Sequence, residues 1–453
     1  MTFFSIDINQ SLIKDYKQLL KLAVPIMLSQ LGVVLMGVAD TVMVGWLGED
    51  ELAGINQGNN IFFMLNGITL GMILGVNTLV SIKVGESKRN KCLSTFIGSI
   101  LISLMVFIIE LIIILFLINN FGILRQEGAI NIITPQYLEI VIWSILPLLF
   151  FTSTRQLTDG LGYTKISLWV NLMGLLMNIF LNGALIYGWF DFPELGYIGC
   201  AWATLYSRIF MMIIGFGYLL FSNSVKDVMK VPMPSFSEVK EQIKEIFKIG
   251  LPISLETTAE WACLAFCGVM VGWYGSVQMA AHAVAWNAVS ITFMMASGIS
   301  IAGNILVGYG YGEQNAKKIR IAAFTTVSSV VALQTINSIV FLLFHKQIAN
   351  AYGVEGEAVK IILPLFVFAS LFQVFDGLQI TLKSLLRGIK DVLWVSVISV
   401  FAYWAVTIPM GYVLAEIYDY KAIGVWIGIS VGFIIASLLS AYRMSHSFKR
   451  LPF

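Results

Sequence analysis

The sequence predicts an all-α polytopic membrane protein, with twelve transmembrane helices in two six-helix bundles related by a pseudo-twofold axis along the membrane normal. Its composition, its long apolar runs and an internal repeat all indicate this fold. Of the 453 residues, 58% are hydrophobic and only 12% are Asp, Glu, Lys or Arg, and the mean hydropathy is +0.84. Soluble domains are about 25% charged. A soluble protein this apolar would expose large apolar patches, and disordered chains are charged and poor in aromatic residues, so both classes are excluded.

Twelve apolar runs are long enough to cross a bilayer as helices. They lie near residues 20–47, 58–82, 93–119, 134–158, 166–190, 196–221, 247–274, 283–310, 320–344, 358–384, 392–416 and 421–444. The runs are continuous, whereas the strands of a membrane β-barrel alternate in polarity over about ten residues, so a barrel is excluded. The net charge of +2 provides no basic face for binding nucleic acid.

Basic residues orient these spans, because Lys and Arg collect in cytoplasmic loops. With the N-terminus placed in the cytoplasm, the inner segments hold 22 Lys and Arg residues and the outer loops hold four. Both termini are therefore predicted to be cytoplasmic. In this assignment Lys383 and Arg387 belong to the inner segment at the end of the tenth span.

The chain repeats itself at an offset of 227 residues. The segment VMVGWLG at 42–48 recurs as VMVGWYG at 269–275. Other residues map in pairs at the same offset: Pro25 with Pro252, Gly71 with Gly298, and Asn77 with Asn304. Each half has six spans, so both halves have the same orientation, with a cavity between them. We divide the chain into an N-terminal lobe (1–221), a cytoplasmic linker with an amphipathic helix (222–246) and a C-terminal lobe (247–453).

Ionisable residues inside the spans are candidates for function, because a charge in the membrane is costly. They are Asp40, Glu110, Arg208, Glu256, Glu260 and Asp376. Carboxylates predominate, which suits a protein that binds Na+ or protons and also a cationic organic solute. Burial favours a protonated carboxyl group and a nearby cation favours the charged form, so one group can exchange a proton for another cation. This exchange is the physical basis of antiport.

These residues form two candidate sites. In the C-terminal half, Glu256 and Glu260 lie one turn apart on one helix face, and Asp376 falls within two turns of the same depth. Asp40 marks the N-terminal half. As an alternative, one of these carboxylates caps a helix kink or pairs with Arg208; no role is assigned to Glu110. Polar residues that could line a substrate or ion site are Asn178, Asn182, Gln379 and His282, although a lone His at a membrane edge commonly serves as a hydrogen-bonding residue.

The chain resembles the multidrug and toxic compound extrusion (MATE) transporters, and within them the NorM-like bacterial branch. The resemblance covers nearly the whole chain. It rests on the repeated VMVGW segment, on GLP at 250–252 followed by Glu260, and on QVFDGLQ at 373–379 followed by LRG at 386–388. The spacing of Asn178 and Asn182 is similar to the fifth-span pattern of the family, where polar residues lie near the N-terminal ion site.

The resemblance implies an exporter of cationic, often aromatic drugs or toxic metabolites in the bacterial inner (cytoplasmic) membrane. Export would proceed by alternating access, driven by inward flow of Na+ or H+. Glu260 and Asp376 match the carboxylates that the NorM-like branch uses for cation coupling, and are thereby candidate Na+ ligands. Asp40 matches the coupling carboxylate of the N-terminal lobe. Phe372 stands where some members have a tyrosine near the cation, so one oxygen ligand is missing.

Three other functions remain as alternatives. A flippase of the same superfamily would move lipid-linked saccharides, but such chains have more spans and cationic cavities. An intramembrane enzyme would need a catalytic set, whereas the three His residues lie far apart and no DDxxD motif occurs. A channel would not require a whole-chain repeat around buried carboxylates. We therefore expect no enzyme activity and no cofactor besides the coupling ion. We expect a monomer whose partners are cationic small molecules and the lipid bilayer.

Overall fold

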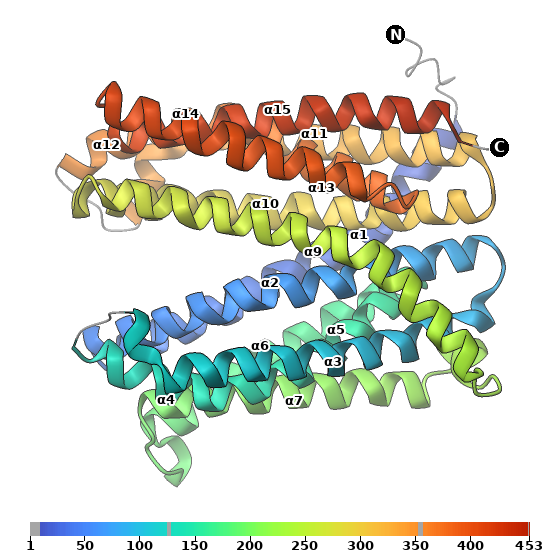
Figure 1. The fold of residues 1–453 in the computed structure, drawn as a ribbon, viewed down its shortest axis with the longest axis horizontal. Helices are drawn as coiled ribbons and strands as arrows, with labels where there is room; N and C mark the ends of the chain where they lie inside the picture. Colours follow the sequence, from blue (N-terminus) through green and yellow to red (C-terminus); the bar gives the residue numbers. More distant parts are fainter. Residues whose placement is uncertain (1–9, 125–127, 352–356, 452) are drawn as a thin grey trace. The chain divides into compact units, whose positions relative to one another are not determined.

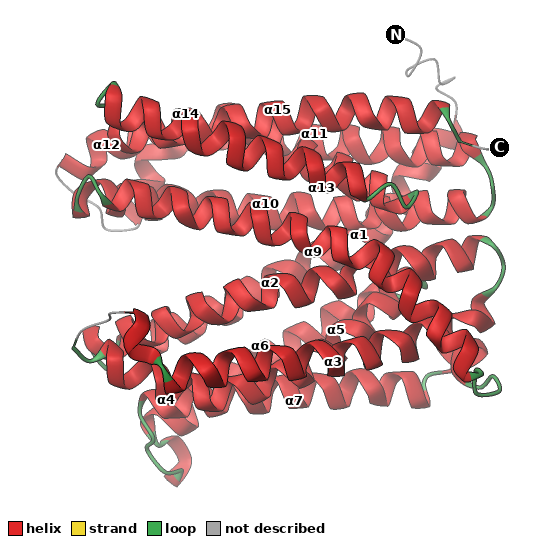
Figure 2. Cartoon of the chain, in the orientation of Figure 1, coloured by secondary structure: helices red, strands yellow, loops and turns green. Residues whose placement is uncertain are grey.

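The structure, a computed structural model, describes residues 10–124, 128–351, 357–451 and 453. Within these ranges it consists of helices and loops and has no strand (Figure 2). The principal helices are α1 (Gln10–Gly45), α2 (Glu49–Gly85), α3 (Cys92–Asn119), α4 (Ile130–Val141), α5 (Ile145–Gly160), α6 (Thr164–Tyr187), α7 (Tyr197–Phe221), α9 (Phe236–Gly272), α10 (Ser276–Gly312), α11 (Ala316–Ala351), α12 (Glu357–Gly388), α13 (Leu393–Val400), α14 (Ile408–Tyr412) and α15 (Lys421–Lys449). The predicted all-α class is confirmed.

Eleven helical segments within the described ranges are long and apolar enough to cross a membrane. Two of them are composite: α4 and α5 make one continuous span, and α13 and α14 belong to another. The remaining predicted span is the second part of α9, a helix of 37 residues. Its two carboxylates, Glu256 and Glu260, lower its hydropathy. The twelve predicted spans therefore all correspond to helices.

The chain folds into two compact units. Unit N is Leu28–Ser254, and unit C combines residues 10–27 with Leu255–Phe453. The boundaries fall inside α1 and α9, at positions 227 residues apart, so each long helix is divided between the units at the same place in the repeat. The units differ from the two lobes expected from the repeat because the beginnings of α1 and α9 are exchanged. In unit C, α10, α11, α12 and α15 pack side by side (Figure 1).

Two repeat-related glycines form close contacts between helices. A Cβ built on Gly71 of α2 would lie 2.6 Å from the Cα of Ser254 on α9. At the equivalent place in the repeat, a Cβ on Gly298 of α10 would lie 2.7 Å from the backbone of Met27 on α1. Small residues let helices in a membrane approach this closely. The glycines are therefore required for packing at these crossings.

Gly71→Ala and Gly298→Ala should each destabilise the protein by about 1–3 kcal/mol, because the added methyl group forces backbone segments apart. Gly37→Ala is the matched control, since its Cβ would meet nothing within 4 Å. The apparent melting temperature in detergent should fall for the two crossing variants and stay level or rise for the control. Equal melting temperatures for all three would show that these crossings are not tightly packed.

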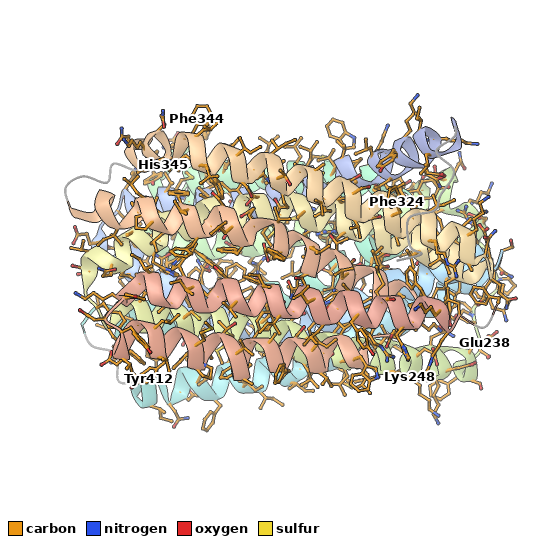
Figure 3. The ribbon with its side chains drawn as sticks, turned by 90° about the horizontal axis from the view of Figure 1, so that it is seen from above. Glu238, Lys248, Phe324, Phe344, His345 and Tyr412 are labelled. Carbon is orange, nitrogen blue, oxygen red and sulfur yellow. The ribbon has the colours of Figure 1, made fainter. Side chains whose placement is uncertain are left out.

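A capping box starts α9. The backbone N–H of Ser235 donates to Glu238 Oε2 at 2.8 Å, and the N–H of Glu238 donates to Ser235 Oγ at 3.3 Å. The Ser235 backbone N–H holds the pKa of the Glu238 carboxyl below its ordinary value. From there α9 runs without a break past Lys248 (Figure 3) into the seventh span. The amphipathic segment predicted at the end of the linker is thus the first part of this helix, with Val239 and Ile246 buried.

Aromatic side chains fill the core of unit C. Phe372 of α12 packs between Trp426 and Phe433 of α15, with ring centroids 5.7 and 5.5 Å away. Tyr403 meets Phe433 edge to face, at 6.0 Å. Toward the end of α11, Phe344 and His345 are labelled in Figure 3. One side of α12, the helix that carries most of the candidate site, is supported by the aromatic rings of Tyr403, Trp426 and Phe433.

Candidate functional site

In unit N, Asp40 lies at the centre of a small polar cluster. Its side chain is buried, and Oδ1 accepts a hydrogen bond from Asn182 Nδ2 at 2.6 Å. Thr204 Oγ1 lies 3.5 Å from Oδ2. Asn182 Nδ2 also reaches Asn178 Oδ1 at 3.3 Å, because the two amides are one turn apart on α6. The structure therefore brings together the three polar residues that the sequence predicted for this half.

Arg208 of α7 supplies the positive charge near this cluster. Its Nη1 donates to Ser144 Oγ at 2.6 Å, and its guanidinium lies 4.6 Å from the centre of the Phe62 ring. Its charge acts on Asp40 through space. Glu256 and Glu260, which the alternative paired with Arg208, form their ion pairs with Lys383 and Arg387 instead.

In unit C, Lys383 of α12 lies between two carboxylates of α9. The ammonium Nζ donates to Glu260 Oε2 at 2.9 Å and to the Tyr403 hydroxyl at 3.1 Å. It also forms an ion pair with Glu256 Oε1 at 3.0 Å. The second Glu256 oxygen accepts from Arg387 Nη2 at 2.8 Å. The side chains of Lys383 and Glu256 are almost fully buried, 3% and 1% exposed.

Tyr403 completes this network from a distorted helix. It lies in a π-helical segment, Phe401–Thr407, that precedes α14. Pro409 follows within a few residues; a proline lacks an N–H, and such residues commonly accompany irregular turns. The Tyr403 oxygen accepts hydrogen bonds from Gln379 Nε2 and from the Lys383 ammonium. Both acceptor positions of the phenol are thus used.

Asp376 is the buried carboxylate of α12. Its side chain is 2% exposed, and Oδ2 has no hydrogen-bond partner within the part of the chain that the structure describes. The charged groups that act on it are Glu260 and Lys383. Glu256, Glu260 and Gln379 share one network through Lys383 and Tyr403, and Asp376 lies on the same helix as Lys383 and Gln379.

Lys383 and Arg387, assigned from the sequence to the inner segment at the end of the tenth span, belong to the last part of helix α12. α12 continues to Gly388, so both side chains project from the helix toward the carboxylates of α9. The charged interior of unit C holds two basic groups beside its three carboxylates. The sequence did contain an indication of this ion-pair network. Lys383 and Arg387 are one turn apart on one helix and Glu256 and Glu260 are one turn apart on another, so the two helices carry pairs of opposite charge. Tyr403 had no comparable signal.

The other candidates lie apart from these networks. The buried His282 accepts a hydrogen bond at Nδ1 from Trp426 Nε1 at 3.0 Å and stacks on Trp286. Glu110 of α3 is buried and accepts a hydrogen bond from Thr69 of α2. The contacts of His282 explain its burial, whereas the second carboxylate oxygen of Glu110 has no hydrogen-bond partner within the described residues.

His282→Leu should lower the apparent melting temperature, because it leaves the buried Trp426 N–H without its acceptor, at a cost of about 1–3 kcal/mol. Export per folded molecule should be unchanged. His345→Leu is the control, since the exposed His345 ring hydrogen-bonds the backbone oxygen of Leu342 one turn earlier on α11. Loss of export by His282→Leu at normal stability would instead assign His282 to the transport pathway.

One family model, MatE, matches the chain twice, over residues 25–183 and 252–413. The two matches take in more than half of the chain and begin 227 residues apart, which is the offset of the repeat. The chain belongs to the MATE family. Its known relatives include the multidrug resistance protein MdtK of Yersinia pseudotuberculosis, 29% identical over 444 residues, which are 96% of each chain. The probable multidrug resistance protein NorM of Mannheimia succiniciproducens is also 29% identical, over 95% of this chain and 93% of its own.

Solved MATE structures share the fold. A multidrug resistance MATE family transporter in an outward-facing conformation superposes with a TM-score of 0.88 at 20% identity, covering 96% of each chain. The predicted NorM-like membership and two-bundle architecture are confirmed. MATE proteins are multidrug efflux transporters of the membrane and are not enzymes, which confirms the expectation that the chain carries no enzyme activity.

Proposed function

We propose that this MATE protein is a cation-coupled antiporter that exports cationic, often aromatic drugs or toxic metabolites by alternating access. The observation that carries the proposal is a buried acidic group in each compact unit, Asp40 in unit N and Asp376 in unit C. Ionisable groups inside membrane helices commonly mark ion and substrate pathways.

In this mechanism the carboxylates alternate between holding a coupling cation, Na+ or H+, and attracting a cationic substrate. Neutralising Asp376 or Asp40 weakens the attraction for the drug, which leaves to the outside. The cation-loaded protein then turns inward, releases the ion to the cytoplasm and takes up a new drug molecule. A ligand drives such a change only by binding the two states with different affinities. The carboxylates provide that difference because their charge changes in each cycle.

The setting of this cycle follows from the same proposal. We place the protein in the bacterial inner (cytoplasmic) membrane as a monomer, with both termini in the cytoplasm. The excess of Lys and Arg in the inner segments supports this orientation. The partners are then cationic small molecules and the lipid bilayer.

The test is efflux of a fluorescent cationic dye from proteoliposomes, with Na+ and pH gradients imposed separately. Dye movement under at least one gradient, and none without a gradient, is the expected result. Empty liposomes under the same gradients provide the control for leak. No movement under either gradient would contradict coupled export and bring forward a flippase that moves lipid-linked saccharides.

A further inference from the structure

We infer that Lys383 is a built-in cation that excludes Na+ from the carboxylates Glu256 and Glu260. The inference rests on the proposed function, since it concerns which ion can drive the transporter. It goes beyond that function by assigning a specificity role to a residue of this chain. If Na+ is excluded, the proton is the coupling ion of the proposed mechanism.

The geometry around the ammonium is that of an oxygen cage. Three oxygens surround Nζ: Glu260 Oε2 at 2.9 Å, Glu256 Oε1 at 3.0 Å and the Tyr403 hydroxyl at 3.1 Å. The ammonium donates hydrogen bonds to two of these oxygens, those of Glu260 and Tyr403, and attracts the third, Glu256 Oε1, as an ion pair. Hard cations such as Ca²⁺ and Mg²⁺ bind to the same kinds of atom, carboxylate and other oxygens. Lys383 therefore takes the place that a free Na+ would need.

The charges are already balanced within this cage. Glu256 and Glu260 carry two negative charges, and Lys383 and Arg387 carry two positive charges, all in direct ion pairs. A Na+ ion entering between the carboxylates would meet two fixed cations. In a buried site the repulsion is little screened by solvent. Since both basic groups are covalently held on α12, neither can diffuse away to make room.

Neither Tyr403 nor the residue at position 372 adds an oxygen that is free to bind Na+. The Tyr403 oxygen already accepts from Gln379 and Lys383. The side chain of Phe372, one turn before Asp376 on α12, has no oxygen and packs against aromatic rings of α15. Within the described residues, Asp376 Oδ2 has no hydrogen-bond partner. These residues do not fit a Na+ ion, in contrast to what the resemblance implies for Glu260 and Asp376.

The test measures binding of radioactive sodium to the purified protein, which needs no transport activity. Lys383→Met keeps the length of the aliphatic stem but removes the ammonium. We expect little Na+ binding by the wild type. The variant should bind Na+ about tenfold more tightly or better, and adding Glu260→Gln should abolish this gain. Lys83→Met is the matched control, because Lys83 is a lysine of unit N that contacts Gln242.

Lys383→Met leaves two buried carboxylates with one cation, so its folding is checked by size-exclusion chromatography. The double variant Lys383→Met/Glu256→Gln removes one charge of each sign and leaves Glu260 free, and it serves if the single variant does not fold. Two results would overturn the inference: wild-type Na+ binding that Glu260→Gln removes, or a folded Lys383 variant that gains no Na+ binding. Neither concerns dye efflux, so a failure of the proposed function is recognised separately, as wild-type protein that moves no dye under either gradient.

Discussion

Asp376→Asn should abolish gradient-driven dye export while the protein still inserts and folds. The substitution keeps the shape of the side chain but removes the charge that alternates during the proposed cycle. Coupling free energies between sites are typically about 1–3 kcal/mol, so gradient-driven accumulation should fall by roughly 5- to 150-fold. The measurement is dye efflux from proteoliposomes, normalised to folded protein.

Glu110→Gln is the control for Asp376→Asn. It also neutralises a buried carboxylate, but one whose contact is a hydroxyl of a neighbouring helix, Thr69. Its export should match the wild type. Full export by Asp376→Asn would exclude this residue from the coupling mechanism. Equal loss of export in both variants would mean that neutralising either buried carboxylate disturbs the fold.

Asp40→Asn should reduce gradient-driven export by a similar factor, because it removes the charge of the buried carboxylate in unit N. The carboxylate accepts a 2.6 Å hydrogen bond from Asn182, and replacing it by an amide removes the charge that Arg208 faces. Thr204→Val is the control variant. Its 3.5 Å contact with Asp40 lies at the limit of hydrogen bonding, so its loss should change export little. The measurement is the same efflux assay under each gradient.

The Asp40 result also separates the two units. If Asp40→Asn exports normally while Asp376→Asn does not, coupling resides in unit C alone. If Thr204→Val is as inactive as Asp40→Asn, the cluster serves a structural purpose and the assignment of Asp40 to coupling is wrong. Melting temperatures of both variants distinguish these readings.

The fold could be predicted from the sequence because the bilayer imposes simple rules. A span must be long, apolar and helical, and the duplicated VMVGW segment shows that six spans occur twice. The exact division into compact units could not be predicted. It depends on contacts such as Gly71 with Ser254, which join residues far apart in the sequence. Hydropathy contains no information about which helix a glycine touches.

The parts of the site that could be predicted are those in which the sequence spacing of two residues places them on one helix face. Asn178 and Asn182 are one turn apart, and so are Glu256 and Glu260, which puts each pair on one helix face. Lys383 was missed because a basic residue near the end of an apolar run is read as part of a loop. Tyr403 was missed because its position depends on the π-helical turns around it. Both errors concern the basic and hydroxyl partners of the carboxylates rather than the carboxylates themselves.

The exchanged beginning of α1 has a consequence for how the chain is made. Residues 10–27 emerge early from the ribosome, yet they pack in unit C, where Tyr16 hydrogen-bonds Ser328 at 2.7 Å. The partner lies 312 residues further along. At about 5–20 residues per second, translation takes roughly 15–60 s to reach it. The contact between the start of the first helix and α11 can therefore form only after the segment that contains Ser328 has been synthesised.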